Sequence, residues 1–224
     1  MKKKLALLMA AMMTAIILAA CGSDDGGTAS EGEGESGDNI LKVGMEANYA
    51  PFNWTQKDDS NGAVKIDGSP EYAGGYDVEI AKKIAEGLGK ELVIVKTEWD
   101  GLLPALQSGV VDAIIAGMSP TDERKEAIDF TENYYTSDFV IVVKKGGDYE
   151  NAKTLEDFKG AKVTGQLNTT NYKVIDQIPG VDKQVAMDNF AAMRVAIETG
   201  AIDGYVAERP EAILRLLQMK TLRM

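Results

Sequence analysis

Apolar positions recur along the chain in two spacings, one typical of strands and one typical of helices. Short unbroken apolar runs, such as 112–116 and 139–143, predict buried strands of the parallel type. A short helix is expected at 102–107, with Pro104 tolerated in its first turn. In chain order, the pattern predicts strand 40–44, a polar surface turn or hairpin at 58–72, helix 77–88, strand 91–97, helix 102–107, strand 112–116, strand 139–143, strand 162–163, helix 170–178, strand 184–187, helix 189–199 and strand 203–207.

Strands that alternate with helices predict an α/β fold with a parallel sheet. The segment 103–117 also aligns with 194–208: in each, a helix ends at Ser/Thr-Gly, two apolar residues follow, and an aspartate opens a buried strand. Gly109 and Gly200 fit the position after a helix end that needs a positive φ. One interpretation is the helix-Gly-strand pattern common to any α/β protein; the other is two similar lobes that face each other, joined by an extended link at 139–145.

The first residues have the form of an export signal. Lys2 to Lys4 are basic, and the apolar stretch up to residue 20 is too short to span a bilayer. The sequence ending in Cys21 resembles the lipobox of bacterial lipoproteins, whose cysteine is lipidated; the alternative is an ordinary signal peptide with a chance cysteine. Gly, Ser, Thr, Ala and acidic residues fill 22–38, so we expect a signal peptide at 1–20 and a disordered acidic tether at 21–39.

Composition narrows the function classes. The chain has no histidine and one cysteine, which excludes Ser-His-Asp and Cys-His catalysis, imidazole metal sites and an internal disulfide. The formal net charge of −11 argues against nucleic-acid binding. We therefore expect no catalytic residues, no metal and no cofactor.

A candidate anion site follows the strand predicted at 112–116. Thr121 is a good N-cap, so free backbone N–H groups are expected there, and Ser119 and Arg124 add a hydroxyl and a planar guanidinium suited to a carboxylate. The alternative is that Arg124 pairs with Asp122, Glu126 or Asp129 on a solvated helix face.

Other polar and aromatic groups stand at the ends of predicted strands, where ligands bind in such sheets. A second helix start, capped by Thr169 or Thr170, could meet the same anion. Tyr49 and Trp99 could enclose the apolar part of a ligand, or could pack in the core. Glu208 is placed to pair with an ammonium group, and Glu46 to assist it. Donors for a carboxylate, acids for an ammonium and aromatic walls describe an amino-acid zwitterion site.

Four motifs carry a resemblance to a known family. The runs 75–81 (GYDVEIA), 99–106 (WDGLLPAL), 112–119 (DAIIAGMS) and 123–131 (ERKEAIDFT) resemble the solute-binding proteins of polar-amino-acid ABC transporters, over nearly all of 40–212. The resemblance implies a type II periplasmic-binding-protein fold with two parallel-sheet lobes and a hinge. It also implies capture of a polar amino acid, without catalysis, and delivery to an ABC permease and its ATPase.

The resemblance also implies roles for individual residues. Arg124 would clamp the ligand α-carboxylate, and the acid that holds the α-ammonium is Glu208 where aspartate is usual. Asn168 stands where glycine is usual in the Gln-x-Gly-Thr-Thr loop. The full set of expected ligand-binding residues is Glu46, Tyr49, Trp99, Gly117, Ser119, Arg124, Gln166, Thr169, Thr170 and Glu208.

The remaining expectations concern organisation. We expect a monomer outside the cytoplasm, anchored to the membrane through lipid on Cys21 only, with a first lobe at 40–141 and a second lobe with hinge at 142–224. Family members continue past the helix begun near Pro210 and return to the first lobe. No turn or strand is predicted to follow that helix here, so a truncated or frameshifted product that binds poorly is expected, rather than a natural compact variant. Alternative functions are a periplasmic enzyme of this fold, such as a dehydratase or a lytic transglycosylase, and a sensory input domain.

Overall fold

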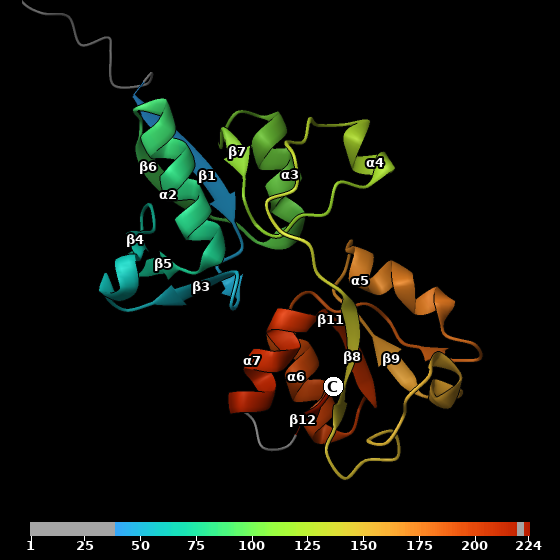
Figure 1. Cartoon of the computed structure of the whole chain (residues 1–224). Helices are drawn as coiled ribbons and strands as arrows, with labels where there is room; N and C mark the ends of the chain where they lie inside the picture. The colour runs from blue at the N-terminus through green and yellow to red at the C-terminus, as the bar shows by residue number, and fades with distance from the viewer. Residues whose placement is uncertain (1–38, 219–221) are drawn as a thin grey trace, which may run out of the picture. The chain divides into compact units, whose positions relative to one another are not determined.

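The computed structural model describes residues 39–218 and 222–224 (Figure 1). The expected signal peptide at 1–20, the lipidation site Cys21 and all of the tether except Asn39 lie outside the described residues. The described chain forms one compact unit with two sheets that are each part of a lobe, and a third small sheet.

The first lobe is built on a parallel sheet of order β6-β1-β7. Its central strand is hydrogen-bonded to β6 along its whole length, from Ile40 opposite Glu91 to Met45 opposite Lys96. The helix predicted from Asp77 ends at Gly89, whose φ of 66° allows its amide to bond the last carbonyls of the helix. The elements are β1 (Ile40–Met45), α2 (Tyr76–Leu88), β6 (Glu91–Lys96), α3 (Trp99–Gln107), β7 (Ala113–Ile114) and α4 (Asp122–Lys125).

A small antiparallel sheet of order β2-β3-β5-β4 stands between β1 and α2 in the chain. The polar segment predicted as a surface turn or hairpin forms its outer part, since Val64 pairs with Ala73 and Lys65 with Tyr72. The elements are β2 (Asn48–Tyr49), β3 (Asn53–Gln56), the 3-10 turn η1 (Ser60–Gly62), β4 (Val64–Lys65) and β5 (Tyr72–Gly74).

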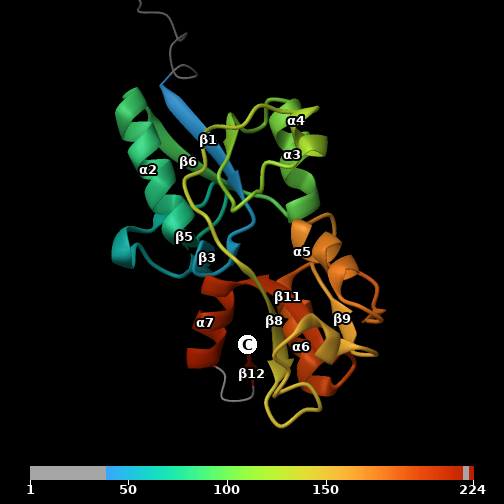
Figure 2. The ribbon, with the colours of Figure 1, turned by 45° about the vertical axis from the view of Figure 1, so that its right-hand side comes forward.

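The second lobe is built on a mixed sheet of order β10-β9-β11-β8-β12. Figures 1 and 2 show the segment after α4 running into β8. Its strands are β8 (Phe139–Lys144), β9 (Lys162–Thr164), β10 (Asp182–Lys183), β11 (Gly204–Glu208) and β12 (Leu222–Arg223). Its helices are η2 (Leu155–Phe158), α5 (Thr170–Lys173), η3 (Val174–Gln177), α6 (Phe190–Thr199) and α7 (Arg209–Gln218).

Two predictions about β8 are wrong. The run 139–143 was expected to be a parallel strand, but Glu208 pairs with Phe139 and Gly204 with Val143, so β8 and β11 are antiparallel. The expected extended link at 139–145 is therefore a full strand of the second sheet. An apolar run indicates burial on both faces of a sheet but carries no information about strand direction.

The predicted helices at 102–107 and 170–178 have different bounds in the structure. α3 begins at Trp99, so Pro104 lies inside the helix and not in its first turn. The helix expected over 170–178 is α5 followed by the 3-10 turn η3, and Ile178 is already extended. The residue before a proline is pushed out of the helical region, and Pro179 follows Ile178.

Two strand predictions in the second lobe are also corrected. The strand expected at 184–187 is displaced to β10 at Asp182–Lys183, and after it only Met187 pairs, in an isolated parallel bridge with Gln166. Between them, the carbonyls of Gln184 and Val185 accept bonds from the side chains of Tyr172 and Thr164. Conversely, a strand does follow the helix near Pro210: β12 pairs with Lys144 and Val143 of β8.

The buried apolar residues fall into clusters that each serve a different part of the fold. One cluster fills the first lobe around Val43 and Ile94, and another lies in the second lobe around Val163 and Ile175. A third cluster joins Tyr49 and Phe52 of the first lobe to Phe190 and other residues of the second lobe. The two lobes therefore share an apolar contact.

Candidate functional site

One cavity brings together all ten of the expected ligand-binding residues, from both lobes. Ala116, Asn171 and Phe190 complete its wall. The ten expected residues in the wall are Glu46, Tyr49, Trp99, Gly117, Ser119, Arg124, Gln166, Thr169, Thr170 and Glu208.

Arg124 is positioned by the start of α4. The hydroxyl of Thr121 caps this helix by accepting a hydrogen bond from the Arg124 amide at 3.3 Å. The guanidinium donates from Nη1 to the Ser119 carbonyl at 2.9 Å and from Nη2 to the Asn168 carbonyl at 2.9 Å, and it lies 5.3 Å from the centre of the Trp99 ring. Two of the five N–H donors are used in these bonds, which fix the plane of the guanidinium and leave the others available to an anion.

The alternative role of Arg124 on a solvated helix face does not match this geometry. Among the ion pairs of residues 39–218, none joins Arg124 to Asp122, Glu126 or Asp129. Burial lowers the pKa of the Arg124 guanidinium, which is the electrostatic sign of a cation withdrawn from water.

Two carboxylates lie in the wall of the same cavity. Glu46, at the end of β1, is 4% exposed, and both of its carboxylate oxygens accept from Nε2 of Gln166, at 3.2 and 3.3 Å. Glu208 is the last residue of β11. Burial raises the pKa of Glu46 to about 7 and that of Glu208 to about 7, because each carboxylate loses solvation without gaining a cationic partner.

The aromatic residues combine both of the roles that the sequence left open. Tyr49 is buried, with its ring stacked on Phe190 at 4.6 Å and on Phe52 at 5.3 Å, so it belongs to the core as well as to the cavity wall. Trp99 starts α3, and its Nε1 donates to the Asn168 carbonyl at 3.3 Å. Trp99 thereby faces both the cavity and the second lobe.

Gly117 is held by a polar network in the first lobe. Its amide donates to the Tyr134 hydroxyl at 2.9 Å, and that hydroxyl donates to Oδ1 of Asp77 at 2.8 Å. Asp77 is fully buried and accepts a second bond from Asn53 at 2.7 Å. Since the Gly117 amide is engaged by Tyr134, it is not free to donate to a ligand. The φ of Gly117 is 63°, a conformation that glycine adopts without strain.

The helix start at 169–170 is placed as the sequence suggested. Thr169 caps α5, because its hydroxyl accepts from the Tyr172 amide at 3.3 Å and donates to the Gln166 carbonyl at 2.6 Å. Thr170 lies against the first lobe, with its hydroxyl 3.4 Å from that of Ser119.

Sequence reasoning missed part of the cavity and its rim. Asn171 and Phe190 lie in the wall. Each follows a predicted helix start by one or two residues, and that position alone does not indicate a ligand contact. Asn168 and Asp100 form a hydrogen bond between the lobes at 2.9 Å. The sequence signal for this contact was the asparagine at 168, where glycine is usual. The structure gives Asn168 a φ of 56°, which is in the left-handed region.

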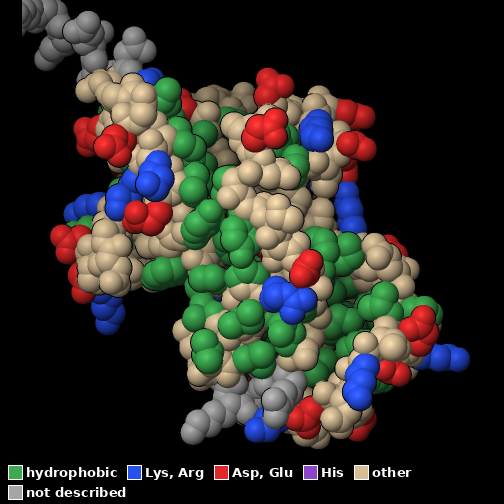
Figure 3. Space-filling view, viewed as in Figure 1, with side chains coloured by type: hydrophobic (Ala, Val, Ile, Leu, Met, Phe, Trp, Pro, Cys, Tyr) green, Lys and Arg blue, Asp and Glu red, His purple; other side chains and the backbone are tan. Residues whose placement is uncertain are grey.

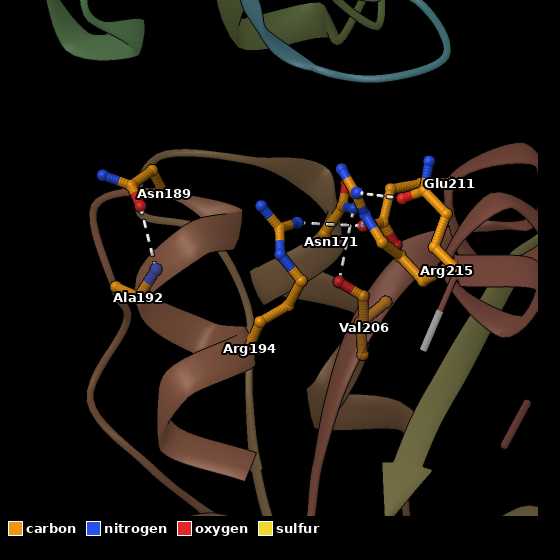
Figure 4. A network of polar contacts seen from close by, with 8 residues as sticks. Asn171, Asn189, Ala192, Arg194, Val206, Glu211 and Arg215 are labelled. Carbon is orange, nitrogen blue, oxygen red and sulfur yellow. Dashed lines mark hydrogen bonds and ion pairs between the residues drawn. The ribbon is translucent and has the colours of Figure 1, made fainter. Parts of the chain in front are cut away.

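A buried ion network supports the helix that follows Glu208. Oε1 of Glu211 accepts from Nη1 of Arg194 at 3.1 Å and from Nε of Arg215 at 3.1 Å (Figure 4). Glu211 is fully buried, and desolvation raises its pKa although both cations lower it. The network joins α6 to the first turns of α7 and so fixes the chain directly after Glu208.

The described residues were also compared with the requirements of a metal site and of a membrane-spanning helix. Within 39–218 and 222–224, no group of three or more Cys, Asp or Glu side chains could hold a metal ion, and no helix is long and apolar enough to cross a membrane. On the face in Figure 3, acidic and basic side chains are interspersed.

Known proteins share sequence with this chain. The family profile of the bacterial extracellular solute-binding proteins, family 3, matches residues 41–215. A probable histidine-binding protein of Campylobacter jejuni is 35% identical over 95% of this chain and 76% of its own length. The arginine-binding extracellular protein ArtP of Bacillus subtilis is 37% identical over 75% of this chain and 57% of its own length, so the chain spans less than two thirds of that relative.

A solved structure shows the same fold. The arginine-bound form of truncated ArgBP from T. maritima superimposes with a TM-score of 0.70 at 33% sequence identity, covering 84% of this chain and 82% of that chain.

Proposed function

The chain belongs to the bacterial extracellular solute-binding proteins, family 3, and we propose on that premise that it captures an amino acid with a cationic side chain between its two lobes. The observation that carries the choice of ligand is the charge of the cavity. The buried Glu46 and the partly buried Glu208 line the same cavity as one guanidinium, that of Arg124. A neutral zwitterion would leave one carboxylate without a cation, whereas an amino acid with a second positive charge supplies a partner for each group.

Each charged group of such a ligand has a partner in the cavity. Arg124 takes the α-carboxylate, for which its planar fork is suited. Glu208 takes the α-ammonium, and Glu46 takes the cationic end of the side chain. The raised pKa values of both carboxyls support this assignment. A desolvated carboxylate without a cationic partner is unfavourable, so an arriving ligand cation stabilises its ionised form strongly. The names of the relatives from C. jejuni and B. subtilis, which refer to histidine and arginine, are consistent with a basic ligand.

The transport partners, the oligomeric state and the membrane anchor are also proposals. The ligand would be released unchanged to an ABC permease driven by its ATPase, and the chain would act as a monomer. Cys21, preceded by Leu18-Ala19-Ala20, would carry lipid that anchors the protein outside the cytoplasm. Support for the export part comes from the family, which is extracellular, and from the basic and apolar residues at 2–20.

Isothermal titration calorimetry with a panel of amino acids tests the proposal. Arginine, lysine and histidine are expected to bind, glutamine to bind more weakly, and glutamate to show no heat of binding. Mass spectrometry of the recovered ligand should show it unchanged. Preference for glutamine or glutamate over all three basic amino acids, or conversion of the ligand, would contradict the proposal.

A further inference from the structure

Asn168 joins the two lobes at the rim of the cavity: its backbone carbonyl bonds Arg124, and we propose that its side chain, through the bond to Asp100, holds the lobes together in the absence of ligand. The affinity part of this inference rests on the proposed function. We call the contacts of Asn168 with Trp99, Asp100 and Arg124 the Asn168 bridge.

The geometry of the bridge is specific. The Asn168 side chain donates from Nδ2 to Oδ1 of Asp100 at 2.9 Å. The Asn168 carbonyl accepts from Nη2 of Arg124 at 2.9 Å and from Nε1 of Trp99 at 3.3 Å. One residue of the second lobe thus makes hydrogen bonds to two different elements of the first lobe, α3 and α4.

The backbone of Asn168 makes this arrangement possible. Its φ of 56° lies in the left-handed region, which glycine and asparagine adopt most readily. A glycine here would keep the carbonyl contacts but would lack the amide that reaches Asp100. The asparagine therefore adds a bond between the lobes without changing the loop.

The side-chain bond of the bridge lies outside the wall of the ligand cavity. Asn168 and Asp100 line an adjoining outer cavity, and neither belongs to the wall of the cavity that contains Glu46 and Glu208, although Trp99 and Arg124 line both cavities. Because neither residue lines the inner cavity, a ligand there is not expected to displace the Asn168–Asp100 bond, and the bond is expected to stabilise the closed state with and without ligand.

Two further contacts lie beside the bridge. Lys173 of the second lobe forms an ion pair with Glu123 of the first, and both side chains are exposed. The hydroxyls of Ser119 and Thr170 are 3.4 Å apart. Asn168 and Asp100 are exposed as well, and an exposed pair contributes little by itself, so closure at this rim is expected to depend on the Asn168 bonds acting together with these two contacts.

The consequence for binding follows from the closed population. When only the closed state holds the ligand fully, a larger closed fraction raises the apparent affinity. Loss of one net hydrogen bond is expected to raise the Kd by about two- to tenfold, mostly through faster dissociation, because the bond must break before release.

Distance measurements in the ligand-free, full-length chain test the bridge directly. Spin labels on Lys125→Cys of the first lobe and Gln177→Cys of the second, in a Cys21→Ser background, report the separation of the lobes. The labelled chain that retains Asn168 should give a narrow distribution of distances between the two labels. Asn168→Gly should broaden it toward longer distances, and Asn168→Asp, which places a second carboxylate beside Asp100, should open it further.

Matched variants complete the test. Asn61 also has a φ of 56° but lies in η1, away from the cavity, so Asn61→Gly should leave the distances unchanged. Asp100→Ala should open the lobes as far as Asn168→Gly, and the two together no further. Unchanged distances in both Asn168→Gly and Asn168→Asp would overturn the inference. A wild-type chain that binds no amino acid would overturn the proposed function, while the ligand-free distances would still decide the bridge.

Discussion

The carboxylate of Asp112 accepts a hydrogen bond from the backbone amide of Lys42 at 2.8 Å, and the Lys42 carbonyl accepts from the Asp112 amide at 2.8 Å. Asp203 makes the same pair of bonds with Lys162 in the second lobe, at 2.8 and 2.8 Å. Each aspartate ties the strand that it opens to the neighbouring parallel strand. The internal sequence repeat therefore marks one structural unit that is used in both lobes.

Asp112→Ala and Asp203→Ala should each lower the free energy of unfolding by about 1–2 kcal/mol, since each removes a charge-assisted bond to a backbone amide. The sites lie in different lobes, so the double variant should lose the sum to within about 0.5 kcal/mol. Urea denaturation measures both effects, with the exposed Asp148→Ala as the control. An effect of the control as large as that of Asp112→Ala would refute the role of the repeated bond.

Tyr134→Phe should destabilise the first lobe by about 1–3 kcal/mol, because it removes the hydrogen bond to Oδ1 of the fully buried Asp77 and the bond that the Gly117 amide donates, while the bond from Asn53 to Oδ2 of Asp77 remains. Tyr135→Phe removes the neighbouring hydroxyl, at an exposed position, and should change stability little. Thermal unfolding followed by circular dichroism compares the two. Equal melting temperatures for both variants would contradict the network.

Glu211→Ala should lower the unfolding free energy by about 3–5 kcal/mol, because Arg194 and Arg215 would be left with no carboxylate in a largely buried site. Replacing all three residues at once, Arg194→Met, Glu211→Leu and Arg215→Met, should cost far less, since no buried charge then remains. Chemical denaturation of the two variants checks this order. A triple variant as unstable as Glu211→Ala would show that packing, not charge, decides the site.

Glu46→Gln and Glu208→Gln should each weaken binding of arginine by about tenfold or more, because each removes one of the two proposed cation partners. Binding of glutamine should suffer less in Glu46→Gln, since glutamine has no side-chain cation. The exposed Glu198→Gln of α6 serves as the control. Calorimetric titration gives the affinities, and unchanged arginine binding in Glu46→Gln would argue against a cationic side chain in that position.

Stability and binding should depend on pH in opposite senses. The pKa of Glu46 is about 7 and that of Glu208 is about 7, above their ordinary value, so the folded chain holds protons more tightly than the unfolded chain. Their contribution to stability is therefore largest below pH about 4.5, falls as the pH rises to about 7 and stays low above it. Ligand-free protein should show this fall in unfolding experiments between pH 5 and 8.

A cationic ligand favours the ionised carboxylates, so its affinity should rise by about tenfold or more over the same interval, with release of protons on binding. Calorimetry in buffers of different ionisation enthalpy measures the protons released. The Glu46→Gln/Glu208→Gln double variant should release almost none. Proton uptake by the wild type on binding arginine would contradict the assignment.

Local pattern predicted most of the elements that position the site. The cap at Thr121, the positive φ of Gly109 and Gly200, and the strand bounds near Glu208 each depend on residues close in sequence, so they could be predicted. All ten expected wall residues meet in one cavity. Strand ends and helix starts, which a parallel sheet brings together, indicated part of this set, and the family resemblance implied the full set.

What the sequence could not predict depends on contacts between distant segments. The direction of β8 is set by its pairing with β11, and the role of Asn168 by Asp100 and Arg124 in the other lobe. The proton affinity of Glu46 also depends on how completely the closed lobes exclude water from it. None of these three properties can be predicted from the spacing of residues that are close in sequence.

Tyr134 belongs to the segment that carries the chain from the first lobe to β8, and its hydroxyl also holds Gly117 in the cavity wall. Because one hydroxyl makes both bonds, a displacement of Tyr134 would change the bond to Gly117 and the bond to Asp77 together. The path of the chain between the lobes and the wall of the binding cavity are thus parts of one mechanical linkage.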